Sequence, residues 1–282
     1  MNTRKLIFDI GTNKGEDAIF YASMGYDVIA VDADPELIQA NKAQHKNYDG
    51  QITFLNYAIA GEDGQQLELY INGDSGMTSL IEEVGSRQQN LAATAMVDTI
   101  TLRTLIKRYG CPYYCKIDIE GFDATAVRSM QGVGEMPAYI SVEAECKPED
   151  DRFSEDGIFE TLDTLRDAGY SSFKLIDQAS LKVLDDKDRY YKSSTTLPYR
   201  AIRKLQKLTH VYFGSYNHKK VLERVHGHPF VYSASGPFGE ATDGEWMDYE
   251  EAKKTYLFQR RQYFSIAANR RYSYWADWHA KF

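Results

Sequence analysis

The sequence predicts an α/β fold with a Rossmann-like, doubly wound and mostly parallel sheet, followed by a C-terminal α-rich cap or extension. Three observations carry this prediction. Apolar strand-like runs alternate with helix-like segments over roughly the first 190 residues, a pattern typical of βαβ units. Two glycines, Gly11 and Gly15, bound the turn between the first strand and the first helix. Near Tyr190 the alternation gives way to polar turns and aromatic segments.

The first βαβ unit is complete by residue 32. Arg4 to Ile10 is an apolar run that predicts a strand, and the helix after the turn ends at Gly25. Asp27 to Val31 predicts the second strand. Asp34 then suits the N-cap of the next helix and Pro35 its first position. A helical crossover between two buried strands implies that they pair in parallel.

The alternation continues to residue 184. The same criteria predict, in order, strands at 52–55, 66–71, 97–102 and 113–119, a helix at 122–130, a strand at 138–142, a helix carrying Ile158, Leu162 and Leu165, and a closing strand pair at 173–176 and 181–184. These elements define a domain over residues 1–190, and residues 191–282 form the C-terminal cap or extension.

The C-terminal extension is rich in aromatic side chains. All three tryptophans lie between Trp246 and the C-terminus, which predicts a segment packed on the α/β domain rather than a free tail. The first strand begins almost at residue 1, so we expect this extension to cover the carboxyl ends of the strands and to set the choice of substrate there.

Composition excludes several classes of protein. Hydrophobic residues make up 43 % and charged residues 26 %, as in an ordinary globular protein. The net charge of -8 argues against nucleic acid as a partner. The apolar runs are too short to span a membrane, and the N-terminus has no signal-peptide layout, so we expect a cytoplasmic protein without a membrane partner. The oligomeric state is not indicated.

The first strand-to-helix turn is the candidate cofactor site, because ligands of doubly wound sheets bind beyond the carboxyl ends of the strands. The two glycines let a ligand approach the backbone, and Asp32 ends the second strand, where an acid commonly binds ribose hydroxyls. The turn reads G-x-x-x-G and follows Asp9. A nicotinamide dinucleotide site would favour G-x-G-x-x-G, so the turn favours S-adenosylmethionine, which has no pyrophosphate.

Taken together, several motifs resemble those of the FkbM family of methyltransferases. The resemblance spans roughly residues 6–180, and its most specific motif is Lys116-Ile117-Asp118-Ile119-Glu120-Gly121. The other matching motifs are Phe8 to Gly15, Val31 to Pro35, Ser75 to Leu80, Val97 to Leu102, and Val142-Glu143. The resemblance implies an S-adenosylmethionine-dependent O-methyltransferase that acts on a hydroxyl of a small molecule, sugar or glycan-like acceptor.

The resemblance also implies which residues bind the cofactor. The loop residues Asp9, Gly11, Thr12, Asn13, Lys14 and Gly15 would hold the methionine end. Asp32 would hold the ribose, with Asp34 beside it sharing that duty, and Asn56 to Ala58 would lie beside the adenine.

Acidic residues near two strand ends are the catalytic candidates. Asp118 and Glu120 alternate with apolar residues and so point to one face, and Glu143 ends the neighbouring strand. Together they suit either a general base or the ligands of a hard cation such as magnesium, and no metal ligand is assigned. Lys116 would hold these acids ionised.

Two other classes of function stay open at this stage. One is a nicotinamide-dependent oxidoreductase of Rossmann type, which the G-x-x-x-G turn disfavours. The other is a non-catalytic adenosyl-binding module that acts through its aromatic C-terminal tail.

Overall fold

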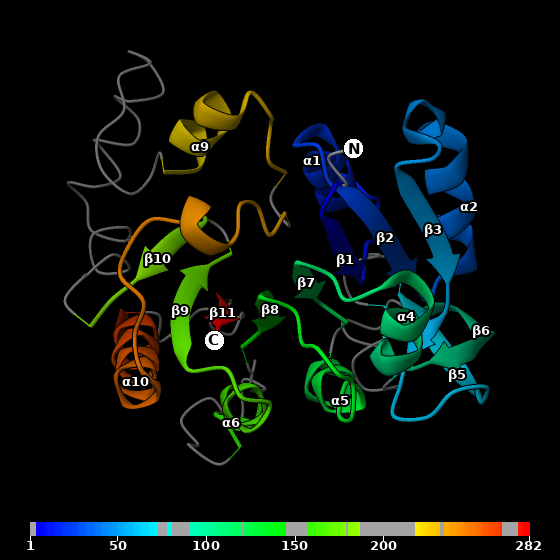
Figure 1. Cartoon of the computed structure of the whole chain (residues 1–282). Coiled ribbons are helices and arrows are strands. Elements are labelled where there is room, and N and C mark those ends of the chain that lie inside the picture. The colour runs from blue at the N-terminus through cyan, green and yellow to red at the C-terminus, as the bar shows by residue number, and fades with distance from the viewer. Residues whose placement is uncertain are drawn as a thin grey trace.

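The computed structural model of the chain describes residues 4–72, 78–80, 91–119, 121–144, 157–178, 180–186, 218–231, 234–266 and 276–282. Its centre is an eight-stranded sheet with the order β10-β9-β11-β8-β7-β1-β2-β3 (Figure 1). The strands are β1 (Leu6–Ile10), β2 (Asp27–Asp32), β3 (Ile52–Asn56), β7 (Tyr114–Ile117), β8 (Tyr139–Glu143), β9 (Ser172–Asp177), β10 (Lys182–Leu184) and β11 (Ala276–Lys281). The predicted Rossmann-like, mostly parallel sheet is confirmed.

Strand β1 lies at the point where the winding of the sheet reverses. It pairs in parallel with β2 on one side and with β7 on the other. From there the chain proceeds to β3 in one direction and to β8 in the other, always in parallel. Ligands of such sheets bind at this reversal, beyond the carboxyl ends of the strands.

Helices cover both faces of the sheet (Figure 1). Side chains alternate along each strand, so Ile7 and Val28 belong to one apolar core and Phe8 and Ile29 to the other. The first core also contains side chains of α1 (Glu16–Ser23), α2 (Pro35–Gln44) and α9 (His218–His226). The second contains side chains of α4 (Leu102–Tyr109), α5 (Asp123–Ser129), α6 (Glu160–Asp167) and α10 (Tyr249–Ile266).

The described part of the C-terminal extension packs on both faces. On the α1 face, Phe238 stacks on the Tyr114 ring of β7, with ring centroids 3.9 Å apart and planes 8° from parallel. Leu222 of α9 is buried in the same core. On the opposite face, Tyr256 of α10 is fully buried against Trp278. The described part of the extension therefore contributes side chains to both cores.

The last strand, β11, is an internal strand of the sheet. It lies between β8 and β9 and pairs antiparallel with both. Sequence reasoning placed residues 276–281 in a cap outside the α/β domain, whereas the structure places them within the sheet. The reason is the alternation of Ala276, Trp278 and Ala280, all buried in one core, with Asp277 and His279 on the opposite face.

A small sheet with the order β4-β6-β5 stands beside α4. Its strands are β4 (Ala58–Ile59), β5 (Gln66–Asn72) and β6 (Leu91–Ile100), and β5 and β6 pair antiparallel. The strand predicted at 97–102 therefore begins earlier and ends at Ile100. Thr101 ends it because its hydroxyl accepts a hydrogen bond from the Thr104 amide and so caps α4.

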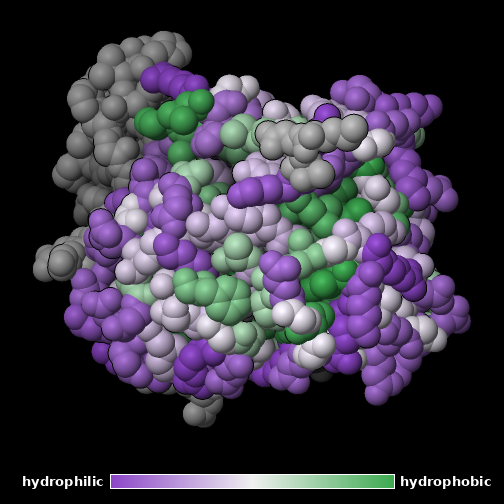
Figure 2. Space-filling view, viewed as in Figure 1, coloured by the Kyte–Doolittle hydropathy of each residue, from purple (hydrophilic) through white to green (hydrophobic). Residues whose placement is uncertain are grey.

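The distribution of hydrophilic and apolar residues on the surface fits the arrangement of a sheet between two layers of helices. In Figure 2 hydrophilic residues dominate the periphery, and apolar residues show mainly in the middle of the view, between the two helix layers. Among the described helices, none combines the length and the apolar character that crossing a membrane requires.

Candidate functional site

The first strand-to-helix loop is held in a tight shape by the neighbouring strand. The amides of Gly11 and Thr12 both donate to the carbonyl of Val31, at 2.9 and 3.0 Å. Gly11, Asn13 and Gly15 have positive φ angles of 77°, 48° and 78°. Two glycines in this loop are therefore a conformational requirement. The Lys14 side chain is exposed, whereas Thr12 is buried.

The start of α1 has no side-chain cap. Its N-cap residue is Gly15, which provides no side-chain hydrogen bond to the first turn. Amides at such an end attract a carboxylate or another anion. Close by, the side-chain oxygen of Asn13 is buried and has no hydrogen-bond partner among the described residues. The loop thus presents backbone donors and one unused buried acceptor.

A buried lysine lies beneath this loop. Lys116 of β7 is opposite Asp9 of β1 in register, and its Nζ lies 3.3 Å from the Asp9 carboxylate and 3.1 Å from the Gly11 carbonyl oxygen. The same Nζ is 3.7 Å from Asp17 and 3.7 Å from Asp118. The other oxygen of Asp9 accepts the Thr12 hydroxyl at 2.6 Å.

These carboxylates control the charge of Lys116. Burial disfavours the ammonium, but Asp9, Asp118 and Asp17 outweigh that penalty and hold the pKa of Lys116 well above its ordinary value. Lys116 is therefore protonated at neutral pH, and it links the loop after β1 to the end of β7.

Asp32 and Asp34 have different partners. The carboxylate of Asp32 accepts the Asn13 amide at 2.8 Å and the Asp34 amide at 2.9 Å. Burial raises the pKa of Asp32 to about 6, although these hydrogen bonds oppose the shift. Asp34 is the N-cap of α2, and its Oδ1 accepts the amides of Glu36 and Leu37.

The two candidates at and just after the end of β3, Asn56 and Ala58, contact different parts of the structure. The Asn56 amide donates to the backbone carbonyls of Asp32 and Ala33, at 3.0 and 2.8 Å, so it braces the end of β2. Ala58 is 2 % exposed and packs with Leu69 and Val97 of the small sheet.

The acidic candidates near β7 and β8 are brought to one edge of the sheet. The Asp118 side chain is 24 % exposed, in contrast to the buried Asp9 and Asp17 beside Lys116. Glu143 is the last residue of β8, and its backbone lies opposite Asp277 of β11. Glu120 lies outside the described residues.

Asp277 is a site residue that sequence reasoning missed. Strand β11 runs antiparallel, so its beginning lies where β8 and β9 end. Asp277 accepts a hydrogen bond from the Gln178 amide. Burial, and next the charge of Asp118, raise its pKa well above the ordinary range. The alternation of Ala276, Trp278 and Ala280 with polar residues was the available signal for this strand.

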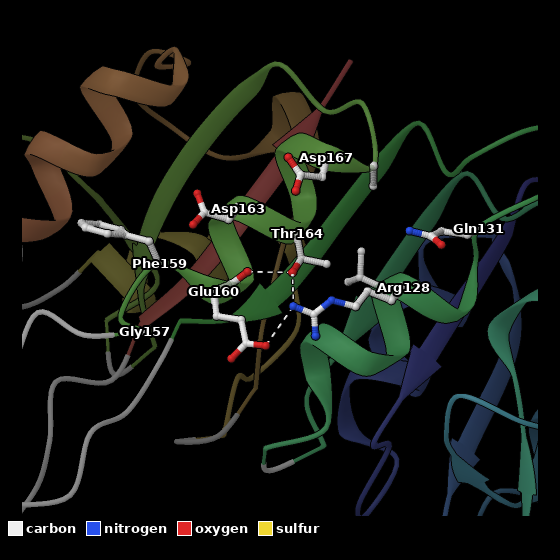
Figure 3. Close-up of a pocket in the computed structure, with 10 residues that line it drawn as sticks. Arg128, Gln131, Gly157, Phe159, Glu160, Asp163, Thr164 and Asp167 are labelled. Atoms are coloured by element: carbon white, nitrogen blue, oxygen red, sulfur yellow. Dashed lines mark hydrogen bonds and ion pairs between the residues drawn. The ribbon is translucent and has the colours of Figure 1, made fainter.

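No three His, Cys, Asp or Glu side chains converge as a metal site would require, within the part of the chain that the structure describes. A surface groove of about 470 Å³ lies between α5 and α6 (Figure 3). Arg128 points across it and pairs with Glu160 at 2.8 Å and with the Thr164 hydroxyl at 3.1 Å. The residues that line this groove include none of the site candidates.

Comparison with known proteins adds a family. Residues 9–172 match the family model described as Methyltransferase FkbM domain. A search of curated proteins found no match.

Solved structures with a similar arrangement include an S-adenosylmethionine-dependent methyltransferase from Geobacter sulfurreducens in complex with S-adenosylhomocysteine. It has 11 % identity and a TM-score of 0.38, with 99 % of this chain and 85 % of that chain covered. A methyltransferase from Thiobacillus denitrificans with the same ligand has 12 % identity and a TM-score of 0.39, with 99 % and 86 % covered. A phosphoethanolamine N-methyltransferase from Haemonchus contortus has 12 % identity and a TM-score of 0.40, with 100 % and 49 % covered.

Proposed function

Since the chain belongs to the FkbM family and is an S-adenosylmethionine-dependent methyltransferase, we propose that it transfers the methyl group to a hydroxyl oxygen of a small-molecule, sugar or glycan-like acceptor. The observation that carries this proposal is the edge where β1, β2, β7 and β8 end. The loop from Gly11 to Gly15 and the carboxylate of Asp32 lie there, together with the partly exposed carboxylate of Asp118 beside the buried Lys116.

The loop after β1 would hold the methionine end of the cofactor. The amides at the start of α1 suit its carboxylate, and the unused oxygen of Asn13 suits its amino group. The other loop residues would contact the cofactor through their backbone atoms; these are Gly11, Thr12, Lys14 and Gly15. The Lys14 side chain is exposed, and the Thr12 hydroxyl already donates to Asp9. These features fit the cofactor.

Asp32 would bind the ribose hydroxyls. Its carboxylate lies at the end of β2 and already orients the loop through the Asn13 amide. Asp34 would contribute through the helix that it caps, and Asn56 by bracing the end of β2. Ala58 would lie behind the adenine as part of the apolar support.

Asp118 would be the general base, with the Lys116 ammonium 3.7 Å away holding its carboxylate in place. When bound, the cofactor supplies an electrophilic methyl group. Asp118 would take the proton from the acceptor hydroxyl as the oxygen forms its bond to the methyl carbon, and the C–S electron pair would go to sulfur. Glu143, with Glu120 as the further candidate, would orient the acceptor for this in-line attack.

The expected partners follow from this chemistry. An acceptor rich in hydroxyls matches the cluster of carboxylates, which accept hydrogen bonds from them. The predictions that nucleic acid and membranes are not partners, and that the protein is cytoplasmic, stay predictions. The expectation that the extension closes the acceptor site also stays a prediction, although its last segment, β11, belongs to the sheet of the α/β domain.

One experiment tests the proposal. The purified protein is incubated with a metabolite extract and methyl-labelled S-adenosylmethionine, and products are analysed by fragmentation mass spectrometry. We expect the label on an oxygen of a hydroxyl-rich molecule, and less of it with Asp32→Ala at a limiting concentration of S-adenosylmethionine. Label found on nitrogen or carbon would contradict O-methylation, and label on an oxygen of a molecule without further hydroxyl groups would contradict the acceptor class.

A further inference from the structure

The C-terminal extension touches the cofactor loop through one buried carboxylate. The backbone amide of Ser235 donates to both oxygens of Asp17, at 3.1 and 3.0 Å, and the Gly236 amide donates at 3.3 Å. Asp17 is in the first turn of α1, directly after the loop. Residues 235 and 236 therefore cap a side chain that lies 218 positions earlier in the sequence.

Through Lys116, Asp17 connects this contact to the loop after β1. One of its oxygens is 3.7 Å from Lys116, whose Nζ also donates to the Gly11 carbonyl and pairs with Asp9. Lys116 is thus surrounded by three carboxylates. Without the two amide donors, Asp17 would be a buried carboxylate that shares a single cation with Asp9 and Asp118, which is costly.

The segment that supplies these amides is itself firmly placed. The Tyr21 hydroxyl donates to the Gly236 carbonyl at 3.1 Å, and Phe238 stacks on Tyr114. Gly236 has a positive φ of 72°, and a side chain there would meet Leu181 at 2.7 Å. The backbone of 235–236 is therefore held from two sides at the position where it meets Asp17.

We infer that residues 234–238 position the cofactor loop through Asp17 and Lys116, so that the C-terminal extension contributes to S-adenosylmethionine binding itself and does not serve the acceptor alone. Asp17 and Lys116 are positioning residues in this role. The inference concerns cofactor binding only and is independent of the proposed O-methylation.

Coupling between two sites is reciprocal, and this gives the test. If the segment stabilises the loop, then a ligand in the loop stabilises the segment. Hydrogen–deuterium exchange of the wild-type protein is measured with and without saturating S-adenosylhomocysteine. We expect slower exchange in the peptide containing Gly11 and also in the peptide containing Ser235 and Gly236. Protection of the first peptide alone would overturn the inference.

Two variants sharpen this test. Asp17→Asn removes the charge at nearly constant shape, and the control Asp27→Asn makes the same change at the start of β2, where Asp27 pairs with Arg4 on the surface. We expect Asp17→Asn to weaken S-adenosylhomocysteine binding by about tenfold in calorimetry and to abolish the ligand-induced protection at Ser235. The control should keep the wild-type affinity and protection. Equal behaviour of the two variants would overturn the inference, whereas absence of S-adenosylhomocysteine binding by the wild type would overturn the cofactor assignment as well.

Discussion

Gly11 packs directly on the backbone carbonyl of Asp118. A Cβ atom at Gly11 would lie 1.8 Å from that carbonyl oxygen, and the Asp118 amide donates to Ile10 at 3.0 Å. The loop after β1 and the end of β7 are therefore in backbone contact, with no room for a side chain at Gly11.

This contact predicts a strong effect of Gly11→Ala on stability. Gly25 has a similar positive φ of 90° but nothing within 4 Å of its Cβ position, so Gly25→Ala isolates the backbone strain. That strain costs roughly 1–2 kcal/mol. We expect Gly11→Ala to lower the free energy of unfolding clearly further, as measured by urea denaturation. Equal losses in the two variants would contradict the close packing.

Lys116→Met should destabilise the fold more than any surface lysine substitution. It would leave the carboxylates of Asp9 and Asp17 buried without their cation, which costs about 3–5 kcal/mol in comparable buried pairs. Lys107→Met, at an exposed position of α4, is the control and should change stability by less than about 0.5 kcal/mol. A Lys116→Met protein as stable as the control would show that this cluster does not depend on the lysine.

Asp118→Asn should lower methyl transfer by roughly 10²–10⁴-fold if Asp118 is the base, while the Kd of S-adenosylhomocysteine stays within about twofold. Glu143→Gln should reduce the rate less, through acceptor binding. Lys116 already provides a cation 3.7 Å from Asp118, so we expect a chelator to leave the wild-type rate unchanged. Loss of activity with a chelator, restored by magnesium, would instead make the carboxylates metal ligands.

The sequence was sufficient to predict the parallel half of the sheet. Its strands are short apolar runs, β1 and β2 are each followed directly by a helix, and local signals such as the Asp34-Pro35 start of α2 mark the boundaries. The register that places Asp9 beside Lys116 is a finding of the structure, since sequence reasoning paired Lys116 with the acids that follow it on the same strand.

Contacts between distant parts of the chain could not be predicted in this way. Strand β11 inserts between β8 and β9, although its sequence follows a long aromatic segment, and this insertion brings Asp277 to the site. Likewise, nothing local indicates that the Ser235 amide binds Asp17. Both depend on how the C-terminal extension covers the sheet, which periodicity in the sequence does not encode.

The affinity for S-adenosylhomocysteine should depend on pH through Asp32. The ribose hydroxyls donate hydrogen bonds, so they bind the ionised carboxylate. Since burial raises the pKa of Asp32 to about 6, affinity should fall as the pH drops from 7.5 to 5. Asp32→Asn should show a weaker dependence.

Calorimetric titration of the Asp32→Ala protein with S-adenosylhomocysteine at pH 7.5 tests the placement of the cofactor most directly. Loss of hydrogen bonds to a charged group, each worth about 1.5–3 kcal/mol, predicts an affinity at least roughly tenfold below wild type. Asp27→Ala is the control, because Asp27 lies at the opposite end of the same strand and pairs with Arg4 on the surface. Wild-type affinity in the Asp32→Ala protein would contradict the assignment of the cofactor to the ends of β1 and β2.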